Sequence, residues 1–273
     1  MPSISDNTCS TSEEVTPRNT IRANRRWLIP TISAIVLVPL AIAALNPSVP
    51  PGGNFDLSYW NLQLPTGSSG DPTTIYSSQL VGDSGYENFT YFFTESGDGA
   101  MVMKVPGSPD DTGCVTTPNS THCRTELAET SSWSPNNEPN RLYATLAVTK
   151  ADPTSYGTVV GQIHMDSSVS TKPVCELYYN QNGDINIGVE QTRSGDDEKF
   201  TYLTNVPLGA TFSYELKYES NTLVANINGN WYTLSTYSLD APLSYFKAGN
   251  YNQSTDSQSG ASDVHFLSLS IVH

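Results

Sequence analysis

Basic residues are scarce in this sequence, which has 273 residues and only 13 Lys and Arg against 27 Asp and Glu. The formal net charge is −14. So few cations cannot hold a nucleic acid by releasing counterions from many phosphates, and we therefore expect no nucleic-acid partner. Ala, Lys and Arg, which favour helices, are also few, whereas 19 Gly and 18 Pro favour turns. The composition disfavours a helical bundle and favours a β-rich chain.

Long hydrophobic runs are missing except for one near the N-terminus. Residues 27–45, WLIPTISAIVLVPLAIAAL, form 19 residues without a charge, long enough to cross a bilayer as a helix. Residues 1–26 are rich in Ser, Thr and Asn and lack apolar periodicity, so we expect a disordered tail. Arg22, Arg25 and Arg26 end that tail, and the positive-inside rule then keeps the tail cytoplasmic.

This arrangement predicts a signal anchor, a single-pass membrane anchor with the C-terminal domain outside the cell. The alternative is a cleaved signal peptide with a long N-terminal region, because residues 41–43 (Ala-Ile-Ala) offer a small-residue cleavage pattern. Both alternatives predict an extracellular domain, either secreted or anchored. Without the tail, this exported part has 9 basic and 24 acidic residues, a net charge of −15.

Cysteine is rare as well, with four in the chain. Cys114 and Cys123 bracket the turn-rich GCVTTPNSTHC, and we expect them to form a disulfide bond in an oxidising compartment. Cys175 lies in an apolar run and is expected to be a buried thiol, whereas Cys9 in the tail has no obvious partner. Three Asn-X-Ser/Thr tripeptides are compatible with a glycosylated, exported domain: Asn88, Asn119 and Asn252.

Residues 46–54 are expected to form a Pro/Gly-rich linker. After it the sequence consists of short runs in which every second residue is apolar. Asn182-Gly183-Asp184 and Asn228-Gly229-Asn230 are favourable hairpin turns between such runs. No long segment after the linker has helical periodicity, and we find no internal repeat. Residues 55–273 therefore predict one all-β domain, a sandwich of two packed antiparallel sheets.

Polar groups occur in register on three of the expected strands, where a buried face should be apolar. Residues i and i+2 of a strand share a face, and the sets that do so are Arg124 and Glu126, then Gln162 and His164, then Lys247, Gly249, Tyr251 and Gln253. Each set taken singly is typical of a solvated sheet face. The three together indicate a functional face, with glycine at position 249 clearing space.

The same three segments resemble the signature strands of a known family. RTELAE at 124–129, GQIH at 161–164 and YFKAGNYNQ at 245–253 are similar to those of the alginate lyases of polysaccharide lyase family 7, and FDLSYWNLQLPTG at 55–67 is similar to its first strand. The resemblance implies a β-jelly roll of two curved sheets with an open concave groove for an acidic polysaccharide. It further implies β-elimination without a metal or other cofactor, which leaves an unsaturated uronate at the new non-reducing end. Ala128 departs from the pattern, because a second arginine commonly stands there.

The chemistry of β-elimination fits the residue types in these strands. Removal of the C5 proton of a uronate requires the neighbouring carboxylate to be neutralised or hydrogen-bonded, and Arg124 and Gln162 are suitable donors. His164 is suited to act as the base, and Tyr251 either as base or as the acid that protonates the leaving O4. The resemblance implies these roles and leaves the division between His164 and Tyr251 open.

Four more residues are expected to bind substrate or support its binding. Lys247 would bind a carboxylate in a neighbouring subsite, and Glu126 would orient Arg124. Asn252 and Gln253 are expected as groove contacts or structural caps. If Asn252 belongs to the motif, its glycosylation site is unused. We expect the protein to be a monomer whose ligand is an acidic polysaccharide.

The other histidines and the acidic clusters predict no metal site. His122 is expected in an exposed loop, and His265 on a strand that packs or faces solvent. His273 ends the chain, and no histidine has a second ligand at metal-binding spacing. Asp110-Asp111 and Asp196-Asp197-Glu198 are expected in solvated loops.

Three other functions compete with the alginate lyase. A glucuronan lyase would share the fold and the chemistry, and a non-catalytic polysaccharide-binding module would share the groove. A retaining glycoside hydrolase needs two carboxyls about 5 Å apart, but Glu126 and Glu129 lie on opposite faces of a strand. Within the family, Ile163 in QIH is associated with accepting guluronate. Because only Arg124 and Lys247 are placed in the groove by motif, we expect a modest dependence of catalysis on salt.

Overall fold

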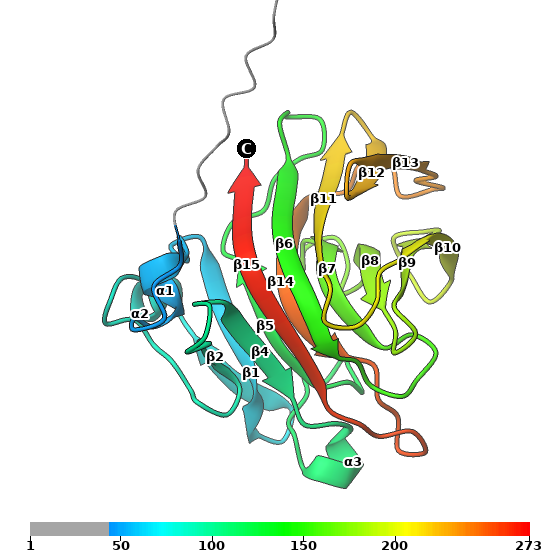
Figure 1. Cartoon of the computed structure of the whole chain (residues 1–273). Helices are drawn as coiled ribbons and strands as arrows, with labels where there is room; N and C mark the ends of the chain where they lie inside the picture. Colours follow the sequence, from blue (N-terminus) through cyan, green and yellow to red (C-terminus); the bar gives the residue numbers. More distant parts are fainter. Residues whose placement is uncertain (1–43) are drawn as a thin grey trace, which may run out of the picture. The chain divides into compact units, whose positions relative to one another are not determined.

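The computed structural model describes residues 44–273, which form fifteen strands and three short helices (Figure 1). The helices are α1 (Pro51–Asn54), α2 (Ser77–Leu80) and α3 (Pro109–Thr112). The strands are β1 (Trp60–Ser68), β2 (Asp71–Ile75), β3 (Phe92–Thr94), β4 (Met101–Val105), β5 (Arg124–Glu129), β6 (Arg141–Lys150), β7 (Thr158–Met165), β8 (Pro173–Tyr179), β9 (Asp184–Glu190), β10 (Glu198–Asn205), β11 (Thr211–Glu219), β12 (Thr222–Ile227), β13 (Asn230–Leu234), β14 (Ser244–Asn252) and β15 (Ser262–Val272).

The predicted N-terminal tail and all but the last two residues of the segment 27–45 lie outside the described residues, as does Cys9. No helix within residues 44–273 combines the length and the apolar character needed to cross a membrane.

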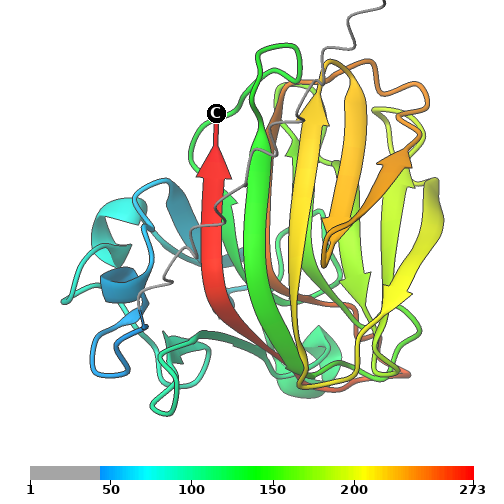
Figure 2. The ribbon, with the colours of Figure 1, turned by 45° about the horizontal axis from the view of Figure 1, so that its top comes forward.

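The strands form two facing antiparallel sheets, as predicted. One sheet has the order β10-β9-β8-β7-β14-β5-β1-β2, and the other has the order β13-β12-β11-β6-β15-β4-β3. Figures 1 and 2 show the curved layer of β15, β6 and β11 lying over the layer that contains β14, β7 and β8. Large apolar side chains fill the space between the layers, including Trp60, Phe212, Phe246 and Phe266, each almost fully buried. This is the jelly-roll-like sandwich that alternating short strands favour.

Period-two alternation sets which side chains enter this core. On β14, Phe246 and Ala248 are buried among the apolar residues, and Asn250 lies on the same inner face. Asn250 is satisfied there, because its amide donates to the Met103 carbonyl at 2.9 Å and its oxygen accepts from the Thr158 hydroxyl at 2.6 Å. The residues between them face the opposite side, which is the outer surface of the eight-stranded sheet.

The two predicted hairpin turns are present. Gly183 has φ +81° in the turn from β8 to β9, and Asn228 and Gly229 have φ +51° and +87° in the turn from β12 to β13. In the second turn, positive φ at both central residues matches the twist of the flanking strands, and asparagine and glycine tolerate it best.

Residues 46–54, expected as a linker, contain α1 and pack on the β-domain. The Asn54 amide donates to the Gly99 carbonyl at 3.3 Å, and the Gly82 backbone N–H donates to the Gly52 carbonyl at 2.9 Å. Leu45 contacts the apolar core. Proline and glycine indicated a flexible connection, but here proline begins a helical turn and glycine permits close contact with the α2 region.

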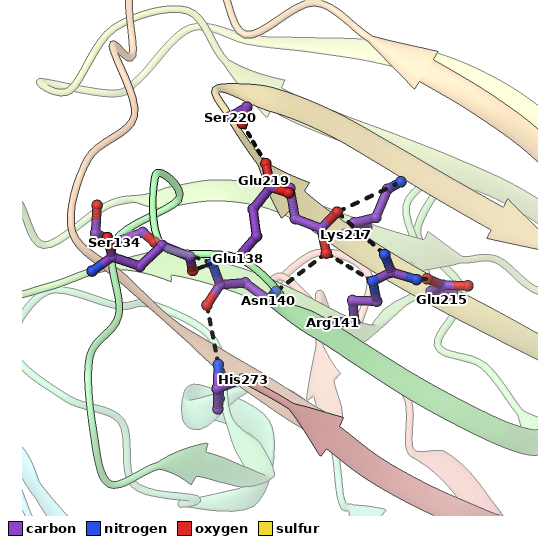
Figure 3. Close-up of polar contacts among 10 residues, drawn as sticks. Ser134, Glu138, Asn140, Arg141, Glu215, Lys217, Glu219, Ser220 and His273 are labelled. Atoms are coloured by element: carbon purple, nitrogen blue, oxygen red, sulfur yellow. Dashed lines mark hydrogen bonds and ion pairs between the residues drawn. The ribbon is translucent and has the colours of Figure 1, made fainter.

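A polar cluster joins strands at one end of the seven-stranded sheet (Figure 3). Arg141 on β6 donates to Glu219 on β11 at 2.7 Å and lies 3.7 Å from Glu215. The backbone N–H of Asn140 donates to the same Glu219 carboxylate, and the side chain of Asn140 contacts His273 at 3.1 Å. These contacts hold His273 against the start of β6, and Arg141 is paired with both Glu215 and Glu219, so the role of the cluster is structural.

Candidate active site

The outer face of the eight-stranded sheet carries a groove with a volume of about 1010 Å³. Its lining crosses the strands from Gln63 on β1 to Glu198 on β10. The three strands that the sequence singled out, β5, β14 and β7, are neighbours in the middle of this sheet. Arg124, Gln162, His164 and Tyr251 all line the groove, so the structure brings the four predicted catalytic residues together.

Glu126 is the shared partner of the polar groups at the centre. Its carboxylate accepts from Arg124 Nη1 at 3.0 Å and from Gln162 Nε2 at 2.5 Å, and it forms an ion pair with Lys247. Burial alone would raise the pKa of Glu126, but the cations Lys247 and Arg124 outweigh it and hold that pKa below its usual range. The predicted contact of Glu126 with Arg124 therefore forms. The part of Glu126 in substrate binding is therefore this support and not a direct contact, because its side chain is 1% exposed and both oxygens are occupied by protein donors.

Gly249 allows this arrangement on the adjacent strand. A Cβ atom at Gly249 would lie 2.6 Å from Glu126 Cα and 2.6 Å from the Thr125 carbonyl oxygen, closer than real contacts allow. The glycine therefore lets β14 approach β5 over the Glu126 carboxylate. Lys247 lies two residues before Gly249 on the same face. Its burial, and to a lesser extent the positive charge of Arg124, lowers the pKa of Lys247 to about 8.

Arg124 and Tyr251 form a stacked pair. The guanidinium carbon lies 3.6 Å from the centre of the tyrosine ring, a cation–π distance. Ser120 contacts both residues: its Oγ accepts from Arg124 Nη2 at 3.1 Å and lies 3.0 Å from Tyr251 Oη. Burial raises the pKa of Tyr251 although Arg124 opposes the shift, so the phenol keeps its proton at neutral pH.

His164 is held in one neutral tautomer. Nδ1 lies 2.8 Å from the Met165 carbonyl, which can only accept, so Nδ1 carries the hydrogen and Nε2 keeps its lone pair. Burial, followed by the positive charge of Lys247, lowers the pKa of His164 to about 3. The Tyr245 ring packs beside it at 5.1 Å. The imidazole is therefore available as a proton acceptor at any pH near neutrality.

The disulfide loop forms one wall of the centre. The predicted bond between Cys114 and Cys123 is present, and the segment that it closes carries Ser120 and His122. The prediction that His122 is exposed is wrong: it is half-buried, its Nδ1 contacts the Ser254 carbonyl at 3.0 Å, and its ring lies 6.0 Å from that of Tyr251. Burial lowers the pKa of His122. Cys175, by contrast, is the buried free thiol that was expected.

Asn252 is a structural cap, one of the two roles expected for it, and it does not line the groove. Its side chain is 1% exposed and points away from the groove, where Nδ2 donates to the Gly260 carbonyl and to the Ser262 hydroxyl, both at 2.8 Å. A glycan on this nitrogen would break both bonds. Gln253 does line the groove, and its amide donates to the Tyr251 carbonyl at 3.2 Å.

Two regions of the groove flank this centre. Toward β1, Ala128 stands in register between Asn61 and Lys247, where no charged side chain replaces the arginine common in the family. Toward β10, the lining is acidic, with Glu176, Glu190 and Glu198.

The prediction that residues 196–198 form a solvated loop fails for its last member. Glu198 begins β10 and is half-buried, and its carboxylate contacts the Tyr178 hydroxyl at 2.9 Å. Asp196 forms an ion pair with Lys172 across two loops of the groove rim.

Among residues 44–273, no group of three or more His, Cys, Asp and Glu side chains is arranged to hold a metal ion. His265 lies 3.2 Å from Asp263 on β15, on the other sheet. Asp110 and Asp111 lie in the first turn of α3, where Asp111 accepts from the Ser259 hydroxyl at 2.9 Å. None of these residues lines the groove.

Comparison with known proteins gives consistent results. The family model described as "Alginate lyase" matches residues 55–273. An alginate lyase from Klebsiella pneumoniae is 27% identical over an alignment 267 residues long. The alignment covers 74% of this chain and 84% of the relative.

Solved structures agree with that match. The structure of alginate lyase A1-II′, described as a member of polysaccharide lyase family 7, superimposes with a TM-score of 0.70 at 29% identity and covers 82% of this chain and 98% of its own. An alginate lyase from Pseudomonas aeruginosa gives a TM-score of 0.67 at 29% identity, covering 80% and 99%. A further structure is a variant of A1-II′ in complex with product (GGG), with a TM-score of 0.71 at 29% identity, covering 82% and 99%.

Proposed function

The chain belongs to polysaccharide lyase family 7, the alginate lyases, and we propose that its groove binds alginate and cleaves it by β-elimination at the cluster around Glu126. The observation that carries the mechanism is the convergence of a fixed guanidinium, an amide, a neutral imidazole and a protonated phenol in one groove. Those four groups are what removal of a proton beside a carboxylate requires.

The carboxylate of the uronate to be cleaved is neutralised by Arg124 and Gln162. Both side chains are fixed by Glu126, so their remaining N–H groups are oriented before substrate arrives. Preorganised donors stabilise the charge that develops on the carboxylate as the C5 proton leaves, and they need no reorganisation in the transition state. Lys247, bound to the same carboxylate, supplies positive charge next to them.

Two groups then transfer protons. Nε2 of His164 has the free lone pair and accepts the C5 proton when that hydrogen faces it. Tyr251 keeps its phenolic proton and donates it to the leaving O4, so that the glycosidic bond breaks and a C4–C5 double bond forms. Where the C5 hydrogen lies on the tyrosine side, the Tyr251 oxygen takes that proton while its own phenolic proton passes to the leaving O4, so that Tyr251 serves as both base and acid. The family resemblance implies that guluronate is the substrate for which His164 and Tyr251 divide these roles.

The domain is proposed to work outside the cell. Its support is the apolar segment 27–45 with arginines before it, together with the disulfide bond between Cys114 and Cys123, which persists in oxidising compartments. The proposal does not include a glycan at Asn252, because the amide nitrogen that would carry it is buried and hydrogen-bonded. An extracellular polysaccharide is then accessible to the groove.

The test incubates the full chain with polymannuronate, polyguluronate and glucuronan and follows the near-ultraviolet absorbance of the unsaturated product. A rise with the alginate polymers, largest for polyguluronate, is expected. A rise with glucuronan only would replace alginate by glucuronan as the substrate. Binding of the polymers without any rise in absorbance would mean a non-catalytic binding module.

A further inference from the structure

The acidic part of the groove lies next to the catalytic centre in sheet register. Gln162 on β7 pairs with Glu176 on β8, Glu176 pairs with Gly188 on β9, and Gly188 pairs with Phe200 on β10. Paired residues of neighbouring strands lie on the same face. A polysaccharide that crosses the strands in this direction from Gln162 therefore meets Glu176 next.

The contacts among Glu176, Tyr178 and Glu198 require one hydrogen more than these side chains carry when both carboxyls are ionised. Tyr178 Oη lies 2.5 Å from Glu176 Oε2 and 2.9 Å from Glu198 Oε2. A phenol has a single hydrogen to donate, and an ionised carboxylate only accepts. Two hydrogen bonds at these distances need a second hydrogen, so one of the two carboxyls is protonated and donates to the Tyr178 oxygen.

Gly188 leaves space for this cluster. A Cβ atom at Gly188 would lie 2.6 Å from Glu198 Oε2, so a larger residue there would displace the carboxyl that lies above β9. The Glu176 side chain is 8% exposed, and its second oxygen has no hydrogen-bond partner among residues 44–273 while lining the groove. That oxygen is a free polar contact for a ligand.

The charges around the cluster favour keeping the proton. Burial, followed by the charge of Glu176, raises the pKa of Glu198 to about 8, and burial also raises the pKa of Glu176. Glu190 faces Glu198 from β9 and accepts from the backbone N–H groups of Asp196 and Asp197, both at 3.2 Å.

The remaining charged and titratable neighbours lie at the edges of the cluster. On the rim, Lys172 is neutralised by Asp196. On the side of the catalytic centre, the cations Arg124 and Lys247 favour the ionised form of Glu176, whereas Glu126 opposes it. Behind β8, burial raises the pKa of the Cys175 thiol, which therefore stays neutral.

Exposed aromatic rings adjoin the cluster. Tyr156 and Phe200 are 47% and 44% exposed, and their ring centres lie 5.8 Å and 5.3 Å from that of Tyr178. These rings line a cavity of about 350 Å³ that shares His122, Gln253 and Glu198 with the groove. Aromatic faces beside a few fixed polar groups suit a sugar ring, whose C–H face packs on the aromatics while its hydroxyls take the hydrogen bonds.

We propose that Glu176, Tyr178 and Glu198, with Tyr156 and Phe200 beside them, form a saccharide subsite that holds a uronate unit only while the shared proton is present. The inference rests on the proposed lyase function. With the proton, the cluster carries one negative charge, and the free oxygen of Glu176 accepts a hydrogen bond from a sugar hydroxyl. Without it, the two carboxylates repel each other across Tyr178 and the cluster presents a second negative charge to a polyanion, which weakens binding.

The test compares the wild type with Glu198→Gln in the full chain, using alginate oligosaccharides of increasing length from about pH 6 to about pH 9. Glutamine keeps an N–H donor and cannot ionise. The ratio of the wild-type KM to the variant KM for long oligosaccharides should rise about five-fold over this range. Titration of Lys247 affects both proteins and cancels in the ratio. The matched control, Asp197→Asn, removes an exposed neighbouring charge and should keep the wild-type pH response.

A second variant keeps the proposal testable if Glu198→Gln does not fold. Phe200→Ala removes an exposed ring and should raise the KM for long oligosaccharides several-fold with little change in kcat. A pH-independent KM ratio, or a Phe200→Ala protein with unchanged KM at every chain length, would overturn the subsite while lyase activity persists. A wild-type protein without activity on any polyuronate would instead overturn the proposed function.

Discussion

The guanidinium of Arg124 lies flat against the ring of Tyr251, with 3.6 Å between the guanidinium carbon and the ring centre. Arg124 also donates to Glu126 on one side and to Ser120 on the other. A planar group with several N–H donors can make all three contacts at once, whereas an ammonium group cannot. The proposed electrostatic donor and the proposed acid therefore hold each other in position.

Replacing Arg124 by lysine should reduce kcat by about 100-fold or more, because the transition state loses a preorganised donor and Tyr251 loses its stacking partner. The rate of absorbance increase on polyguluronate measures the loss. Arg141→Lys is the matched control, since Arg141 lies on the seven-stranded sheet in a structural cluster. A kcat within about three-fold of the wild type for Arg124→Lys would contradict the role of the guanidinium.

Tyr251→Phe should reduce turnover by about 1000-fold while the protein stays folded, because only the hydroxyl that protonates O4 is removed. Tyr245→Phe is the control: Tyr245 lines the same groove, and its hydroxyl has no hydrogen-bond partner within residues 44–273. The control should retain most of its activity. Circular dichroism establishes that both variants are folded, and substantial turnover by Tyr251→Phe would rule out the proposed acid.

Much of the fold could be predicted because each strand's alternation is a local property. Gln162 and Ile163 occupy opposite faces whatever lies elsewhere in the chain, and the period-two pattern of β14 placed Lys247 and Tyr251 together. The start of the edge strand β10 was expected as a solvated loop because most residues of that strand are exposed. The motif allowed Asn252 to be either a groove contact or a cap, although period two already put it on the face opposite Tyr251.

The missed residues of the site depend on contacts that no local pattern encodes. Ser120 reaches Tyr251 across 131 positions, and His122 is held by the carbonyl of Ser254 across 132. Glu198 looked solvated beside two aspartates, but its burial depends on Gly188 and Tyr178 of other strands. The bracketing cysteines were the available signal for Ser120, because a closed loop beside a polar strand limits where its side chains can lie.

Burial of neutral His164 should make the fold sensitive to acid. The folded pKa of about 3 lies below the 6.5 of a free histidine, so between these values the unfolded chain binds more protons and stability falls as pH decreases. At about pH 4 the loss attributable to His164 is on the order of 3 kcal/mol. His164→Asn should therefore lose less unfolding free energy between about pH 7 and pH 4 than the wild type, as urea denaturation measures. Equal losses in both proteins would show that His164 is not buried in its neutral form.

Restoring the arginine that the family commonly has at Ala128 should strengthen substrate binding. Ala128 lines the groove in register with Lys247, so an arginine there would add a cation and two parallel N–H donors for a uronate carboxylate. A charged hydrogen bond partly offset by repulsion from Lys247 predicts a KM about five-fold lower at low salt. The wild type should show a shallow dependence of KM on salt because it has few groove cations, and Ala128→Arg should show a steeper one. Ala128→Gln, which adds length and donors without charge, separates the two contributions. If Ala128→Arg and Ala128→Gln respond to salt alike, the added charge does not reach the substrate, and the acidic domain would then depend on Arg124 and Lys247 alone for its attraction to a polyanion.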